Sequence, residues 1–188
     1  CVEPLGCVVV LATVTRYGQP GGVAPIKYES MKTIVTFGEV MGRLCPPGFL
    51  RIRQCLPGPL DVTFAGAEAN VAASVAMLGG RTRFVTSLPD PDISEACVQK
   101  RRAVGIDTSC ILRTDRGRLG LYWVETGANQ RPSRVVYDRE GSSVSLIPGE
   151  DDDWETTVEG AGWLHFTGIT PALSRTAAEA CAVAARAA

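Results

Sequence analysis

The 188-residue chain has few of the features that would point directly to one type of chemistry. It contains one histidine, His165, and none of its seven cysteines stands in a Cys-x-x-Cys pair. A zinc site is therefore not expected, because such sites draw on clustered His and Cys ligands, and we interpret His165 as a partly buried strand residue. The cysteines are odd in number and several lie in apolar segments, so we expect reduced thiols in a cytoplasmic protein.

Two nucleotide-binding motifs are also missing from the sequence. Neither G-x-G-x-x-G nor G-x-x-x-x-G-K-[ST] occurs, so neither a dinucleotide fingerprint nor a P-loop is expected. The formal net charge of −1 gives no electrostatic reason to expect nucleic acid or an anionic membrane as a partner. No apolar run is long enough to span a bilayer, and an apolar content of 45% is that of an ordinary globular chain.

The most informative stretch begins at Ala65, where the small-residue turn A-G-A-E-A-N opens an alanine-rich helix that ends at Gly79-Gly80. Gly66 has no Cβ, so it can take a positive φ and let a ligand approach the backbone. The first N–H groups of the helix have no intrahelical acceptor, and Asn70 can both donate and accept hydrogen bonds. The stretch therefore predicts a seat for a polyol or a carboxylate, although close packing of a helix on a sheet would require the same residues.

Strand-like and helix-like segments alternate along most of the chain. Short apolar runs predict strands over 32–37, 61–64, 82–87, 109–112 and 163–168, with helical patterns between several of them. This alternation predicts an α/β fold with a parallel sheet. Asp92 and Glu95 resemble a capping box for a helix in which Arg101 falls on the apolar stripe. The acidic run before Trp154 is expected to cap a helix, because acidic side chains suit helix N-termini.

Two further strand-like runs, 119–125 and 134–139, flank a Gly- and Pro-containing turn and predict a β-hairpin. Period-two alternation puts Tyr137 and Arg139 on one face, and Tyr122 can face the same side from the partner strand. Two phenols and a guanidinium on one face can bind a small oxygenated anion, since Arg pairs bidentately with carboxylates. An exposed hairpin face with ordinary cross-strand pairs is the alternative interpretation.

The two ends of the sequence differ from its middle. Residues 1–30 are expected to be an extension outside the fold, because 18–25 has a loop composition and Met31 resembles a natural start that leads into the first strand. The sequence stops inside a predicted helix over 176–188, whereas a doubly wound unit is expected to continue into another strand. We therefore expect a domain truncated after its N-terminal half.

Five short segments are more informative together than alone: F-G-E (37–39), A-G-A-E-A-N-V-A (65–72), G-L-Y (120–122), Y-D-R-E-G-S (137–142) and H-F-T-G-I-T-P-A-L (165–173). In this order they resemble the PfkB-type, ribokinase-like carbohydrate kinases, and in particular the 2-keto-3-deoxygluconate kinase branch, over residues 31–188. The resemblance implies an α/β ribokinase-like parallel-sheet sandwich with a small β-sheet lid, built from about 43–64 and 118–140. It also implies phosphoryl transfer from ATP, with Mg²⁺, to a sugar or sugar acid; a fructokinase-like substrate is the alternative within the family.

The resemblance also assigns roles to individual residues. Gly66 and Asn70 would hold sugar hydroxyls, while Tyr122, Tyr137 and Arg139 would hold the substrate from the lid, with Arg139 facing a sugar-acid carboxylate. The family's catalytic aspartate, in a Gly-Ala-Gly-Asp turn, and its ATP pocket belong to the C-terminal half, so no catalytic, cofactor-binding or metal-binding residue is expected in this sequence.

Three expectations about the chain as a whole follow from the missing half. The chain alone is expected to be inactive as a kinase. A non-catalytic sugar-binding module and an inactive remnant are the alternatives to a kinase fragment. The lid hairpin is a candidate contact for a homodimer, because the unpaired N–H and C=O groups of an exposed edge strand can pair with another chain.

Overall fold

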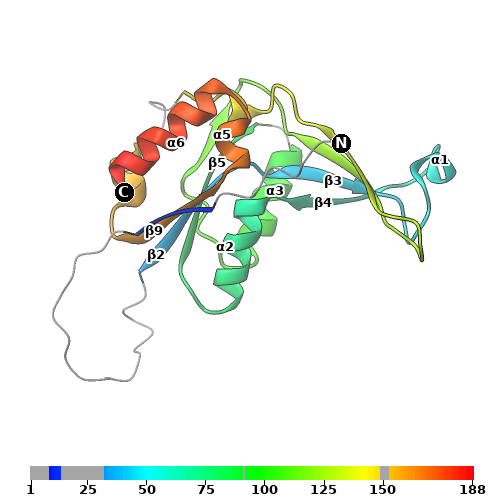
Figure 1. Ribbon diagram of the computed structural model, residues 1–188, viewed down its shortest axis with the longest axis horizontal. Helices are drawn as coiled ribbons and strands as arrows, with labels where there is room; N and C mark the ends of the chain where they lie inside the picture. The colour runs from blue at the N-terminus through cyan, green and yellow to red at the C-terminus, as the bar shows by residue number, and fades with distance from the viewer. Residues whose placement is uncertain (1–8, 14–31, 91, 149–152) are drawn as a thin grey trace.

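The computed structural model describes residues 9–13, 32–90, 92–148 and 153–188 (Figure 1). The strands are β1 (Val9–Thr13), β2 (Thr33–Phe37), β3 (Met41–Cys45), β4 (Asp61–Ala65), β5 (Thr82–Pro89), β6 (Ile111–Thr114), β7 (Leu121–Glu125), β8 (Arg134–Asp138) and β9 (Ala161–Thr167). The helices are α1 (Ile52–Cys55), α2 (Ala67–Met77), α3 (Asp92–Arg102), the 3₁₀ helix η2 (Ser143–Leu146), α4 (Trp154–Val158), α5 (Ile169–Ala172) and α6 (Arg175–Ala187).

The larger sheet has five strands in the order β1-β9-β2-β5-β6. Strands β9, β2, β5 and β6 run parallel to one another, and only β1 is antiparallel to its neighbour. Parallel neighbours need crossover connections, which α2 and α3 supply before and after β5. The predicted α/β fold with a parallel sheet is confirmed.

Helices cover both faces of the larger sheet, and the sheet separates the hydrophobic core into two clusters (Figure 1). The alternation of side chains along β5 shows this division, because Phe84 and Val85 are both fully buried but belong to different clusters. Phe84 packs with residues of α2 and α3, including Ala72 and Val98, whereas Val85 packs with residues of α4 and α6. The alanines of α2 and α6 allow these helices to lie close to the sheet.

The smaller sheet has four strands in the order β4-β3-β7-β8 and extends away from the helical layers (Figure 1). Strands β7 and β8 form the predicted antiparallel hairpin. Strands β3 and β4 form a second antiparallel pair, which joins the hairpin through parallel pairing of β3 with β7. These strands lie within or next to the two ranges predicted for a lid. Only the buried residues 38–40 separate β2 of the larger sheet from β3 of the smaller one.

The expectation that residues 1–30 lie outside the fold is wrong for Val9–Thr13. This segment forms β1, which pairs along β9 so that Val9 lies opposite Thr167 and Thr13 opposite Trp163. An unpaired edge strand exposes a row of N–H and C=O groups, and the β-branched, apolar run of β1 is well suited to pair with it. Residues 1–8 and 14–30 lie outside the described residues.

Details of the helices agree with the sequence in most places. Ser174 caps α6 by accepting a hydrogen bond from the N–H of Ala177 at 3.0 Å, and Asp153 caps α4 in the same way. Helix α3 begins at Asp92 itself, so Asp92 lies in its first turn rather than ahead of it. Arg101 is buried on the inner face of α3, where its Nη2 donates to the carbonyl of Phe64 at 2.7 Å. This hydrogen bond accounts for an arginine on the apolar stripe.

The five cysteines among the described residues are all free thiols. Cys1 and Cys7 lie outside that part of the chain. His165 is a buried residue of β9, as expected. No helix in the described segments combines the length and the apolar character that crossing a membrane would require.

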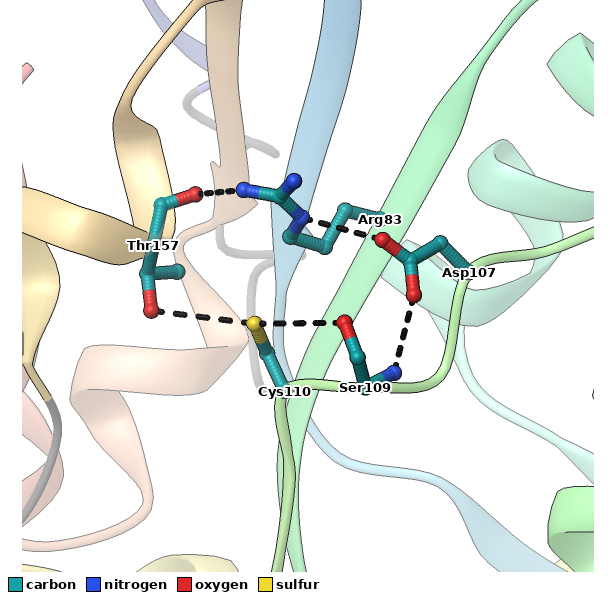
Figure 2. Close-up of polar contacts among 5 residues, drawn as sticks. All are labelled: Arg83, Asp107, Ser109, Cys110 and Thr157. Carbon is teal, nitrogen blue, oxygen red and sulfur yellow. Dashed lines mark hydrogen bonds and ion pairs between the residues drawn. The ribbon is translucent and has the colours of Figure 1, made fainter.

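A polar cluster fixes α4 to the amino ends of β5 and β6 (Figure 2). The guanidinium of Arg83 lies 3.1 Å from the carboxylate of Asp107 and donates to the carbonyl of Thr157 at 2.6 Å, while the N–H of Ser109 donates to Asp107 at 2.9 Å. Burial alone would raise the pKa of Asp107, but the bonds from Ser109 and Arg83 hold it below its usual value. Every member of this cluster is engaged with another, so we assign it a structural role.

Candidate functional site

Four of the five segments singled out in the sequence meet at Gly38 and Glu39, immediately after the carboxyl end of β2, and the fifth, 165–173, joins them through Glu68. In open parallel sheets, ligands bind outside the carboxyl ends of the strands. The opposite end of the larger sheet carries the Arg83 cluster described above. The convergence therefore lies where this type of fold places its binding sites.

The first link runs through Glu68, a buried residue in the first turn of α2. Its Oε1 accepts hydrogen bonds from the N–H of Thr167 at 3.0 Å, from the hydroxyl of Thr167 at 2.5 Å and from the hydroxyl of Thr170 at 3.0 Å. Its Oε2 faces Gly38, where an added Cβ would lie only 2.2 Å away. Glu68 thus holds the start of α2 against the ends of both β2 and β9.

Gly66 forms the second link, but not through the conformation that the sequence suggests. Its φ is −168°, which is ordinary extended backbone, so the positive φ allowed for in the sequence analysis is wrong. A Cβ on Gly66 would lie 2.0 Å from the carbonyl oxygen of Glu39 and 3.1 Å from Cα of Val40. Glycine is needed here because the start of α2 touches the β2–β3 joint, and protein rather than a ligand fills the space beside it.

Asn70 lies one helical turn further along α2. Its backbone N–H donates to the carbonyl of Gly66 at 2.8 Å, which closes the first turn. Its side chain is exposed and makes no hydrogen bond to any residue that the structure describes. The amide therefore keeps its full capacity to donate to and accept from a ligand hydroxyl.

The two predicted tyrosines lie side by side on the smaller sheet. Tyr122 of β7 is directly opposite Tyr137 of β8, and their ring centroids are 5.8 Å apart. Tyr137 is 58% exposed, which leaves its phenol open to a ligand. Burial raises the pKa of the Tyr122 phenol, an effect that Arg43 opposes and Tyr137 strengthens. Tyr122 is therefore a neutral hydrogen-bonding group at physiological pH.

Arg139 completes this face of the smaller sheet. Its guanidinium carbon lies 5.6 Å from the centroid of the Tyr137 ring, within the range of a cation–π contact. Its Nη2 donates to Oε2 of Glu39, so the two side chains form an ion pair. The predicted grouping of Tyr122, Tyr137 and Arg139 on one face is what the structure shows.

Glu39 was missed as a site residue, although it belongs to one of the five segments. The available signal was an acidic residue directly after a Gly at the carboxyl end of a core strand, where ligand-binding residues concentrate. Gly120 also packs against it, because a Cβ there would lie 2.7 Å from Oε1 of Glu39. Glu39 thus contacts the segments that carry Gly66, Gly120 and Arg139.

The carboxylates at this convergence do not fit a metal site. One oxygen of Glu68 is occupied by three donors, and Glu39 is paired with Arg139. Across the described residues, no group of three or more His, Cys, Asp or Glu side chains is placed to hold a metal ion. We assign neither a magnesium ligand nor an ATP contact to these residues.

Comparison with known proteins adds to this geometry. The model of the pfkB family carbohydrate kinases matches residues 31–188. The chain is 36% identical over 146 residues to the 2-dehydro-3-deoxygalactonokinase of Haloferax volcanii, and 30% identical over 156 residues to the 2-dehydro-3-deoxygluconokinase of Thermoproteus tenax. These alignments cover 78% and 79% of this chain but 45% of each relative, so the chain spans a little under half of their length.

Solved structures give the same result. The crystal structure of the 2-dehydro-3-deoxygluconokinase of Thermotoga maritima superposes with a TM-score of 0.78 at 46% identity, covering 81% of this chain and 46% of that one. A 2-keto-3-deoxygluconate kinase assigned as putative, from Enterococcus faecalis, gives a TM-score of 0.77 at 29% identity. The chain therefore shares the fold of these kinases over most of its length, and it belongs to the pfkB family of carbohydrate kinases.

Proposed function

We propose that this chain is the sugar-binding part of an ATP-dependent kinase whose acceptor is 2-keto-3-deoxygluconate or a closely related sugar acid. The observation that carries the proposal is the position of Arg139 beside Tyr137 and Tyr122 on one face of the smaller sheet. The names of the relatives from Haloferax volcanii, Thermoproteus tenax and Thermotoga maritima support the same class of acceptor.

Each residue would have a distinct part in holding the acceptor. Arg139 supplies the positive charge that a sugar-acid carboxylate requires, and the phenols of Tyr122 and Tyr137 hydrogen-bond its oxygen atoms. The free amide of Asn70 binds its hydroxyls, while Gly66 supports Asn70 by letting the start of α2 pack against the link between β2 and β3. When bound to the whole protein, ATP with Mg²⁺ supplies the phosphoryl group, and the residues of this chain orient the hydroxyl that receives it.

A neutral sugar is the second candidate, because fructokinases also resemble this chain. A probable fructokinase of Arabidopsis thaliana is 31% identical over 62% of the chain. A neutral sugar would have no group to match the guanidinium of Arg139, so the sugar acid is the better fit. The site would distinguish a sugar acid from a neutral sugar by the carboxylate that only the sugar acid carries.

Isothermal titration of the 188-residue chain with 2-keto-3-deoxygluconate and with fructose tests the proposal. We expect the sugar acid to bind at least about tenfold more tightly, the value of one modest charge-assisted hydrogen bond. Arg139→Gln should remove this preference while leaving the affinity for fructose within about twofold. Tighter binding of fructose by the unaltered chain, or no binding of the sugar acid, would overturn the proposal.

We also propose that the chain alone does not turn over ATP, because its sequence contains no Gly-Ala-Gly-Asp turn. A coupled assay for ADP release with 2-keto-3-deoxygluconate measures this directly, and robust turnover would contradict it. If the chain binds the sugar acid and melts cooperatively, it can act as a sugar-binding module. Aggregation or a non-cooperative melt would instead favour an inactive remnant.

Two broader proposals accompany the family assignment. A homodimer formed through the smaller sheet is consistent with the exposed apolar side chains of Val62, Val135 and Val136 on its strands. Light scattering coupled to gel filtration would detect the dimer, and a monomer at all concentrations would exclude it. A cytoplasmic location suits a kinase that uses ATP and carries free thiols, and localisation of a tagged chain in cells tests it.

A further inference from the structure

The ion pair between Glu39 and Arg139 joins residues 100 positions apart in the sequence. Glu39 follows β2 of the larger sheet, and Arg139 follows β8 of the smaller sheet. The side chain of Glu39 is 4% exposed and that of Arg139 is 20% exposed, so solvent screens the pair only weakly. Arg139, which we propose binds the substrate carboxylate, is therefore already paired with a carboxylate of the protein itself.

The hydrogen bonding of this pair is incomplete on both sides. Oε1 of Glu39 and Nε of Arg139 are buried, and neither has a hydrogen-bond partner among the described residues. Gly120 packs against Oε1 without offering it a hydrogen bond. The contact is thus a single bond rather than the two-bond fork that Arg and carboxylates commonly form. Since unused buried polar atoms are costly, a one-bond pair is easier to rearrange than a fork would be.

A substrate carboxylate that reaches Arg139 would meet two opposite charges. It would be attracted by the guanidinium and repelled by Glu39 a few ångströms further away. At an effective dielectric constant of about 20, repulsion between unit charges at that separation changes affinity by at least about tenfold. A neutral sugar would feel almost none of this effect. Glu39 therefore acts selectively on anionic ligands.

We infer that Glu39 sets how strongly the site selects a sugar acid over a neutral sugar, by competing with the substrate carboxylate for Arg139. This inference rests on the function proposed above. Glu39 is a specificity-determining residue that acts through Arg139, and the F-G-E, G-L-Y and Y-D-R segments meet here because they build this pair. The competition limits the affinity for the sugar acid.

The central test is Glu39→Gln in the 188-residue chain, because glutamine preserves the shape of the side chain and removes its charge. We expect the affinity for 2-keto-3-deoxygluconate, measured by isothermal titration, to rise about tenfold. The affinity for fructose should change less than about twofold. An affinity for the sugar acid that is unchanged or lower, in a variant that still melts cooperatively, would overturn the inference.

Asp138→Asn is the matched control. Asp138 is the neighbour of Arg139 and pairs with Arg118, so the control also removes a carboxylate from an arginine pair. Because that pair lies outside the proposed site, its loss should leave the preference for the sugar acid unchanged. An equal rise in affinity in the control would show that net charge, not the Glu39 contact, is responsible, and would overturn the inference.

A second measurement detects the pair without any sugar. The side-chain N–H signals of Arg139, assigned by their loss in Arg139→Lys, should exchange slowly in the unaltered chain and quickly in Glu39→Gln. Fast exchange in the unaltered chain would overturn the inference even if the sugar acid binds. Slow exchange in a chain that does not bind the sugar acid would instead overturn the proposed function.

Glu39→Asp is the alternative test of the competition if the glutamine variant does not fold. Aspartate keeps the charge but withdraws the carboxylate from Arg139 by one methylene group. The affinity for the sugar acid should then rise by less than in Glu39→Gln but in the same direction. A fall in that affinity would contradict the competition.

Discussion

Gly66 and Glu39 approach each other so closely that a Cβ on Gly66 would lie 2.0 Å from the carbonyl oxygen of Glu39. The obstruction is backbone on both sides, so no side-chain rotation can relieve it. The contact joins the start of α2 to the short link between the two sheets. It explains the glycine without any appeal to an unusual backbone conformation, since φ of Gly66 is −168°.

Gly66→Ala should therefore destabilise the protein by at least about 2 kcal/mol, because overpacking against rigid neighbours typically costs 1–3 kcal/mol. Urea unfolding followed by circular dichroism measures the change. Ala67→Ser, at the exposed next position, is the control and should stay within about 0.5 kcal/mol. An alanine variant as stable as the unaltered chain would show that α2 can move away from Glu39.

Removal of the Glu68 side chain should be more damaging. Glu68→Ala leaves three buried donors of Thr167 and Thr170 without their acceptor, and we expect a loss of about 3 kcal/mol or more. Thr170→Val removes only one of these bonds and should cost about 1 kcal/mol. Equal losses in the two variants, measured by urea unfolding, would argue against a shared acceptor.

Cys181 should make stability depend on alkaline pH. Burial, with a further contribution from the charge of Glu68, raises the pKa of its thiol from 9.0 to about 12. The unfolded thiol therefore ionises first as the pH rises, and the folded state loses stability between pH 9 and 12. Between pH 8 and pH 10 the unaltered chain should lose about 1 kcal/mol relative to Cys181→Ala. Parallel unfolding curves for both chains would rule this out.

Arg101 offers a test of a buried cation with one good hydrogen bond. In Arg101→Met the carbonyl of Phe64 loses its donor, and we expect destabilisation of about 1–3 kcal/mol. The exposed Lys100→Met is the matched control, with an expected effect below about 0.5 kcal/mol. A methionine variant that is more stable would mean that desolvation of the arginine outweighs its hydrogen bond.

Sequence patterns predicted the architecture well where periodicity is strong. Alternation along the strands predicted that Tyr137 and Arg139 share a face and that Tyr122 can share it, and the register of the hairpin then places Tyr122 opposite Tyr137. The helix cap in the acidic run before Trp154, which the structure places at Asp153, was predicted because acidic side chains accept bonds from the free N–H groups of a helix start. The order of the five segments predicted the family.

These local sequence patterns could not predict contacts between residues that are distant in the sequence. The sequence contains nothing that pairs Glu39 with a residue 100 positions away, and the role of Gly66 depends on where the backbone of Glu39 lies. Strand β1 was missed for the same reason, because pairing with β9 depends on a free sheet edge rather than on local composition. Local rules predict elements, whereas close approaches and pairings are properties of the assembled fold.

The three-residue link between the sheets limits how the smaller sheet can move. Gly38, Glu39 and Val40 are all buried. Gly38 packs against the side chain of Glu68, and the carbonyl of Glu39 packs against Gly66. A close-packed joint of this kind cannot act as a free pivot. Because Glu39 belongs to this joint and pairs with Arg139, the guanidinium is tied to the larger sheet as well as to the smaller one.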